Sequence, residues 1–146
     1  MIINGIFNGL YLRGVIPIRK FYQTRNSIIW PAVDEAADWY TNTEWIGVSA
    51  APTAHFILEK FGETGGEADQ ITNFFIKYDV PTKVNSTEKM WVVNWPKLYK
   101  DFPTQRDGMT VKALILNRFA DRAVSVSAFP KFSNTLKFVD YVMRST

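Results

Sequence analysis

Three carboxylates lie within five residues of this sequence, at Asp34, Glu35 and Asp38. Pro31 precedes them and is typical of the first turn of a helix, where its missing N–H costs no hydrogen bond. On such a helix Asp34 and Asp38 share one face, whereas Glu35 points elsewhere. Two carboxylates on one face can hold a hard cation such as Mg²⁺. Acidic residues near a helix N-terminus also stabilise the helix, so both interpretations stay open.

The composition excludes several other kinds of site. The 146 residues contain no cysteine, which excludes disulfides and thiolate metal sites. The one histidine, His55, cannot form a His-rich zinc site, and we do not expect a Ser–His–Asp relay. The net charge of +3 comes from scattered Lys and Arg residues, so we expect no nucleic-acid duplex as a partner. We also expect no membrane span and a soluble, cytoplasmic protein.

The chain length, with no linker or internal repeat in the sequence, predicts a single domain over residues 1–146. Helical spacing predicts helices within 1–12, after Pro31, over 54–61 with an end at Gly62, over 111–119 and over 136–143. Short apolar runs predict strands at 11–18, 20–25, 45–52, 73–80 and 88–96. The first two strands should form an antiparallel pair.

The helix after Pro31 should bury one apolar stripe, formed by Val33, Ala36, Ala37 and Tyr40. Strands that alternate with helices, some of them antiparallel, indicate an α+β fold. We therefore expect an antiparallel-rich sheet with helices on one face.

Three stretches follow one another in a suggestive order: "LYLRGVIPIRKFY", "NSIIWPAVDEAADWY" and "EWIGVSAAP". They resemble the second half of a class III nucleotidyl cyclase domain. That family has an Arg-Gly strand, then a helix with an Asn and an Arg four residues apart, then an Ile-x-Val-Ser-like strand. "WVVNWP" and "KFSNTLKFVDYV" further resemble bacterial cyclase-like proteins, including pyrimidine cyclases, so the resemblance covers nearly the whole chain.

The resemblance implies a ferredoxin-like cyclase domain, of which this chain is the C-terminal portion without the early strands. Such enzymes join the 3′-hydroxyl of a nucleoside triphosphate to its α-phosphate and release pyrophosphate, with two Mg²⁺ or Mn²⁺ ions. Their active sites form between two paired domains, which implies a homodimer or a partner chain. The family's metal-binding aspartates lie before the part matched here, so we assign no metal ligand. We expect cyclase activity only if a metal-aspartate half completes the chain.

Matched onto the family's motifs, Asp34 and Asp38 take the catalytic positions of the Asn and the Arg. Ser27 takes the base-reading position and Trp30 the position of a glycine, which makes both nucleotide-binding candidates. Arg13 is a structural or phosphate-facing candidate. An aspartate in place of the arginine puts negative charge where the transition state needs positive charge, unless a metal or a lysine compensates.

Three functions stay open at this point. The chain is a portion of a cyclase, a non-catalytic nucleotide-binding or dimerisation module derived from one, or a metal-dependent phosphohydrolase that uses Asp34, Glu35 and Asp38. The candidates for a phosphate-binding lysine are Lys77, Lys83 and Lys89. We expect the chain to be part of a longer protein or a natural remnant. An incomplete sheet would need cover, which favours dimerisation, strand exchange or a partner chain.

Overall fold

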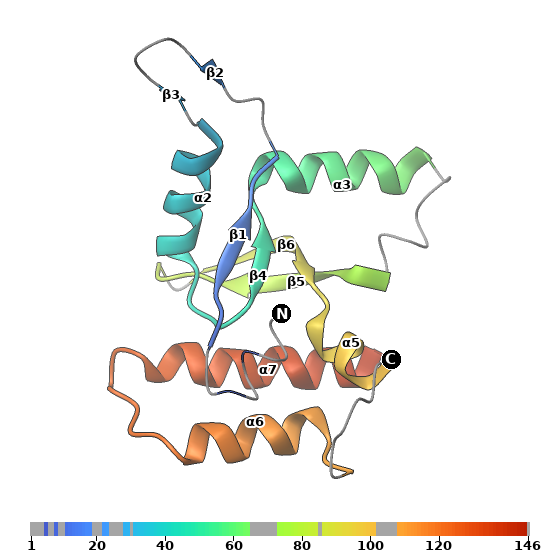
Figure 1. Ribbon diagram of the computed structural model, residues 1–146. Coiled ribbons are helices and arrows are strands. Elements are labelled where there is room, and N and C mark those ends of the chain that lie inside the picture. Colours follow the sequence, from blue (N-terminus) through green and yellow to red (C-terminus); the bar gives the residue numbers. More distant parts are fainter. Residues whose placement is uncertain are drawn as a thin grey trace.

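The computed structural model describes residues 5, 8, 11–18, 22–23, 28–29, 31–64, 73–84, 86–101 and 108–145. Its strands are β1 (Gly14–Ile16), β2 (Tyr22–Gln23), β3 (Ile28–Ile29), β4 (Val48–Ala50), β5 (Phe75–Pro81) and β6 (Thr87–Val93). Its helices are α2 (Pro31–Asn42), α3 (Pro52–Thr64), α5 (Trp95–Asp101), α6 (Val111–Ala120) and α7 (Phe129–Ser145) (Figure 1). The α+β class is thereby confirmed. The helix expected within 1–12 lies almost entirely outside the described residues.

Four strands form one mixed sheet in the order β1-β4-β6-β5. The parallel pair β1 and β4 is joined through α2, and β6 is antiparallel to both of its neighbours. The longest ladder joins β5 to β6, from Phe75 opposite Val93 to Pro81 opposite Thr87. The antiparallel pair predicted between 11–18 and 20–25 is wrong, because β1 pairs with β4 and β2 pairs with β3. Parallel pairing across a helical crossover is non-local, and the runs themselves do not reveal it.

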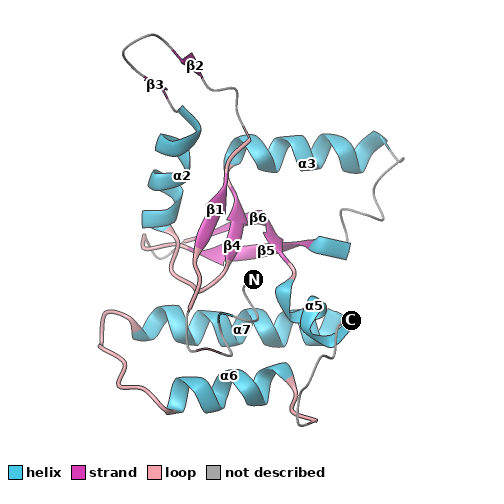
Figure 2. Cartoon of the chain, viewed as in Figure 1, coloured by secondary structure: helices cyan, strands magenta, loops and turns pink. Residues whose placement is uncertain are grey.

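Helices cover both faces of the sheet, which corrects the expectation of helices on one face (Figure 2). Successive residues of β6 point to opposite faces. Met90 and Val92 belong to the main core with α5, α6 and α7, whereas Trp91 packs with Ala54 of α3 on the other face. A strand buried on both faces reads as a continuous apolar run, and that is how "MWVV" reads.

The main core contains a cluster of aromatic rings between α7 and the sheet. The Phe138 ring is edge-on to Trp45 and to Tyr78, with centroids 4.9 Å apart in both pairs. Burial, together with the charge of Asp79 and the neighbouring Tyr141, raises the pKa of Tyr78 to about 12. These contacts hold α7 against β5 and against the segment that leads into β4.

Several element ends differ from the sequence prediction: α7 begins at Phe129, well before residue 136, and β1 and β4 are shorter than the predicted runs. Helix α3 continues past Gly62 to Thr64. Strand β6 ends at Val93, and Asn94 starts α5 by accepting hydrogen bonds from the peptide groups of the next turn. Pro96 then occupies the first turn of α5, where proline is tolerated. None of the helices described here is long and apolar enough to cross a membrane.

Candidate functional site

Helix α2 is rotated relative to the sequence prediction, and it contains no fully buried residue. Val33 is 51% exposed and Tyr40 is 43% exposed, and Ala37 between them is also exposed. The half-buried residues follow helical spacing on another face: Ala32, Glu35, Ala36 and Trp39. The expected buried stripe is therefore wrong for Val33, Ala37 and Tyr40. These three residues form a surface that we call the outer face of α2.

Glu35 explains the rotation, because its carboxylate joins α2 to the start of α3. One oxygen, Oε1, accepts the Thr53 N–H at 3.0 Å, and Oε2 accepts the Thr53 hydroxyl at 2.7 Å. The first peptide N–H groups of a helix have no partner within the helix, and negative charge is favoured there. Glu35 thus caps α3 from a neighbouring helix. Its oxygens are occupied by Thr53, which separates Glu35 from Asp34 and Asp38.

Replacing Glu35 with alanine should lower the free energy of unfolding by about 1–2 kcal/mol, because two charge-assisted hydrogen bonds at a helix N-terminus are lost. Urea denaturation followed by circular dichroism would measure the change. Glu63→Ala, at an exposed carboxylate near the other end of α3, is the control and should change stability by less than about 0.5 kcal/mol. Equal effects of the two substitutions would show that Glu35 is not a cap.

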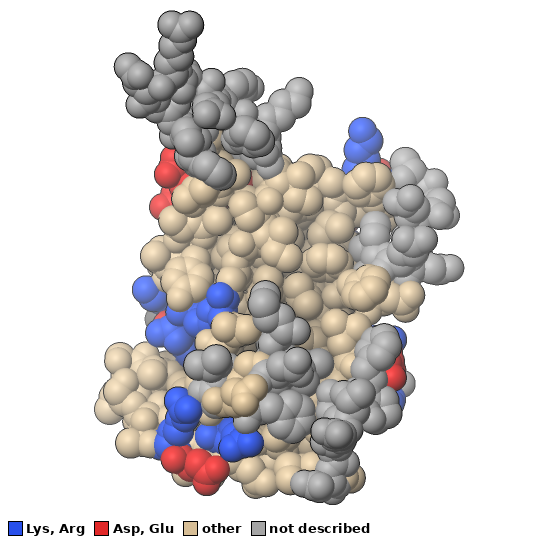
Figure 3. All heavy atoms as spheres, in the orientation of Figure 1, with Lys and Arg blue, Asp and Glu red and all other residues tan. Residues whose placement is uncertain are grey.

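Asp34 and Asp38 both point outward and are exposed. Neither carboxylate forms an ion pair with any of the residues that the structure describes. They lie beside the apolar residues of the outer face of α2. In Figure 3 acidic atoms lie over the upper part of α2, apart from the larger group of Lys and Arg atoms lower on the same face. Within the described part of the chain, no three His, Asp or Glu side chains gather as a metal site.

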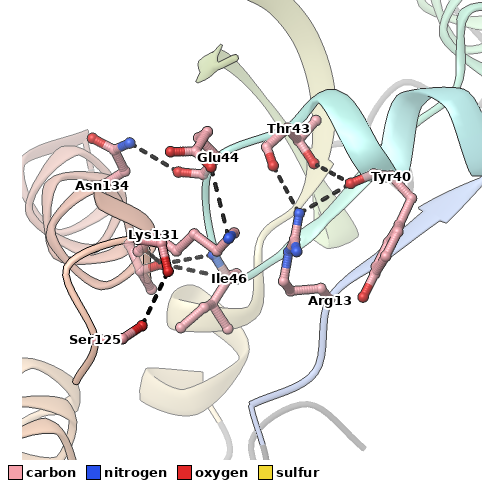
Figure 4. Close-up of polar contacts among 10 residues, drawn as sticks. Arg13, Tyr40, Thr43, Glu44, Ile46, Ser125, Lys131 and Asn134 are labelled. Carbon is pink, nitrogen blue, oxygen red and sulfur yellow. Dashed lines mark hydrogen bonds and ion pairs between the residues drawn. The ribbon is translucent and has the colours of Figure 1, made fainter. Parts of the chain in front are cut away.

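Arg13 lies at the other end of α2, where it binds one carbonyl group in the last turn and one just past the helix (Figure 4). Its Nη2 donates to the Tyr40 carbonyl at 3.0 Å and to the Thr43 carbonyl at 2.7 Å. The guanidinium also lies over the Tyr40 ring, 4.6 Å from the centroid. A cation at a helix C-terminus is favourable. These contacts join Arg13 to the backbone and to the ring of Tyr40. The other two nucleotide-binding candidates, Ser27 and Trp30, lie outside the described residues.

Of the three candidate lysines, Lys77 is the one that is held by a described carboxylate. Its Nζ is 2.8 Å from Oε2 of Glu59 and lies 5.1 Å from the Trp91 ring centroid. The hydrogen bond and the charge of Lys77 hold the pKa of Glu59 below its ordinary value. Lys83 and Lys89 are exposed. Lys77 therefore joins β5 to α3 and lies away from the outer face of α2.

Replacing Lys77 with methionine should raise the pKa of Glu59 toward its ordinary value. A depressed carboxyl pKa adds stability above the unfolded-state pKa, and this stability is lost as the pH falls through the folded-state pKa. The Lys77→Met variant should therefore show a smaller loss of stability on acidification. Carbon-detected NMR titration of the Glu59 carboxyl group measures the shift directly. Lys89→Met, on the neighbouring strand, should leave the Glu59 pKa unchanged.

The sequence prediction missed how α7 holds the segment between α2 and β4. The Thr135 hydroxyl is buried and accepts the Ile46 N–H at 2.8 Å, and Asn134 donates to the Glu44 carbonyl at 2.8 Å. Lys131 adds an ion pair with Glu44 at 3.7 Å. Thr135, three residues before the buried Phe138, was the available signal. A polar residue at a buried helix position needs a hydrogen-bond partner.

The chain was compared with known families, curated proteins and solved structures. The chain matches no family model, no curated protein and no solved structure.

Proposed function

We propose that this chain is a dimerisation module derived from a class III nucleotidyl cyclase, which pairs with a second copy of itself through the outer face of α2. The observation that carries the proposal is the exposure of Val33, Ala37 and Tyr40. They follow the i, i+4, i+7 spacing by which a helix normally buries its apolar stripe. An apolar stripe that its own domain leaves uncovered is typical of an interaction surface.

Tyr40 is suited to be the anchor of this interface. Arg13 stacks on its ring and also binds its carbonyl oxygen, so the ring is held before any partner arrives. A preorganised aromatic side chain loses little conformational entropy on binding, and Tyr is enriched among residues that dominate binding energy. Arg13, the arginine of the Arg-Gly motif, would therefore act at the interface by holding the Tyr40 ring and would not contact phosphate.

The edge of the sheet supports the same proposal. Strand β1 pairs with β4 on one side, and no strand among the described residues pairs with its other side. A free strand edge tends to pair with another chain. A second chain that added a strand there would extend the sheet toward the ferredoxin-like arrangement of the cyclases.

In such a dimer, Asp34 and Asp38 would lie where the two copies meet, which we call the junction. The resemblance assigns ribose and phosphate contacts to these two positions. Their negative charges oppose a triphosphate. We therefore expect no cyclic product when the chain alone is incubated with nucleoside triphosphates and Mn²⁺. Formation of a cyclic nucleotide and pyrophosphate would contradict the non-catalytic assignment.

A double variant, Asp34→Asn with Asp38→Arg, tests the junction itself because it restores the residue types of the family. Its affinity for a nucleoside triphosphate in the presence of Mg²⁺, measured by calorimetry, should exceed that of the parent at least tenfold. The control Asp79→Asn with Asp121→Arg makes the same change in net charge at exposed sites on other elements. A gain that the control reproduces, or no gain at all, would contradict the assignment of Asp34 and Asp38 to the junction.

A further inference from the structure

Strand β6 has an edge that β4 covers at a single position, Ser49 opposite Val92. In an antiparallel ladder, hydrogen-bonded pairs alternate with pairs that are not hydrogen-bonded. The Asn94 N–H donates to the Phe74 carbonyl, and β5 and β6 continue in this register. Even-numbered residues of β6 therefore bond to β5. The peptide groups of odd-numbered residues, including Lys89, point toward the uncovered edge.

His55 of α3 occupies part of this edge. Its Nδ1 accepts a long hydrogen bond from the Trp91 N–H, at 3.4 Å. The other ring nitrogen, Nε2, lies 3.7 Å from Oε1 of Glu59. The imidazole thus supplies an acceptor for the Trp91 N–H where a neighbouring strand would otherwise do so. Two positions earlier, the N–H and C=O of Lys89 have no partner among the described residues.

A cavity of about 300 Å³ opens at this point, between α2, α3 and β6. Trp39 of α2 and Phe56 of α3 line it, together with His55 and Lys89. Phe56 is 68% exposed, and its ring contacts the imidazole of His55 edge-on. The cavity therefore combines aromatic surface with a peptide donor and a peptide acceptor that belong to one residue.

We propose that this cavity binds a planar heterocycle of the nucleobase class. The peptide N–H and C=O of Lys89 match a ring edge that carries an acceptor next to a donor, as an adenine edge does. The ring face would lie against Phe56 and Trp39, because every base has a π-face that stacks on aromatic side chains. The lining carries one cation, Lys89, and one anion, Glu88, which suits an uncharged ligand. This site goes beyond the proposed dimerisation and does not use the outer face of α2.

Titration of the ¹⁵N-labelled chain with adenine, followed by amide chemical shifts, tests the proposal. We expect saturable shifts at Lys89 and at the neighbouring amides of β6. 9-Methyladenine keeps the N6 donor next to a ring acceptor and should bind, whereas N6,N6,9-trimethyladenine has no N–H donor and should bind at least tenfold more weakly. Absence of saturable shifts with adenine, or equal binding of the two methylated compounds, would overturn the proposal. The proposal would also be overturned if a short extended peptide produced shifts at this edge and adenine produced none.

Three variants separate stacking from the other contacts. Phe56→Ala should weaken adenine binding at least fivefold, because one stacking ring is lost. The Phe56 side chain is exposed, so the substitution should not unfold the protein. Lys89→Ala keeps the peptide groups and should change the affinity less than twofold. Phe129→Ala removes an exposed ring on α7, 63% exposed, and should leave the affinity unchanged. Adenine binding that is insensitive to Phe56→Ala would contradict the proposed orientation.

Discussion

Replacing Phe138 with alanine should lower the free energy of unfolding by about 3–5 kcal/mol, the range for truncating a buried Phe. Phe138 is 0% exposed. Its ring contacts Trp45 and Tyr78 edge-on and lies 6.2 Å from the Trp95 ring. Truncation would leave a cavity among rings that belong to the sheet, to α5 and to the segment before β4. These rings are fixed by different elements, so they cannot collapse together into the space.

Urea denaturation of the parent and of Phe138→Ala gives the difference. Phe129→Ala is a matched control, because it is the same substitution at the start of the same helix. Phe129 is 63% exposed, and its truncation should change stability by less than about 0.5 kcal/mol. Similar losses for both variants would mean that the aromatic cluster is not the centre of the core.

Gly47→Ala should lower the free energy of unfolding by about 1–3 kcal/mol through overpacking. A Cβ at Gly47 would lie 2.6 Å from Cη2 of the Trp45 ring. Trp45 is 1% exposed and packs against Phe138, so its ring has no free space to enter. The ring folds over Gly47 because α7 holds the residue between them, Ile46, through Thr135.

Gly62→Ala is the control for this substitution. Gly62 lies in α3, and nothing lies within 4 Å of the position that its Cβ would take. Alanine should therefore leave stability unchanged or raise it by up to about 1 kcal/mol, because alanine favours the helix. Thermal unfolding of both variants should move the melting temperature in opposite directions or leave Gly62→Ala at the parent value. A Gly47→Ala variant as stable as the parent would contradict the packing of Trp45.

Individual helices and strands could be predicted where a regular hydrophobic pattern extends over many residues. The helices over 111–119 and 136–143 appear as α6 and α7, and the runs at 73–80 and 88–96 appear as β5 and β6. Each of these segments carries enough apolar residues for its period to be read from the sequence alone. Non-local pairing could not be read in this way. The parallel pairing of β1 with β4 depends on where α2 crosses the sheet.

In the candidate site, contacts between residues far apart in the sequence were likewise not predictable. Two faces of α2 carry apolar residues, one with Ala32 and Trp39 and one with Val33 and Tyr40, and the sequence pattern favoured the second. The structure turns another face inward because Glu35 finds two donors on Thr53, 18 residues later in the chain. The spacing of Asp34 and Asp38 on one exposed side followed from helix geometry. The role of Arg13 at the C-terminal end of α2 needed the fold.

Sedimentation equilibrium of the full chain, over a concentration range from about 1 to 100 µM, a range typical for weak to moderate association, tests the pairing through α2 most directly. We expect a reversible dimer, with a mass that approaches twice 16.8 kDa. Val33→Asp should return the chain to the monomer, because a buried unpaired carboxylate opposes the interface. Val84→Asp, at a position that is 72% exposed in the turn after β5, should leave the dimer intact. A parent chain that is monomeric throughout, or a dimer that survives Val33→Asp, would contradict pairing through this face.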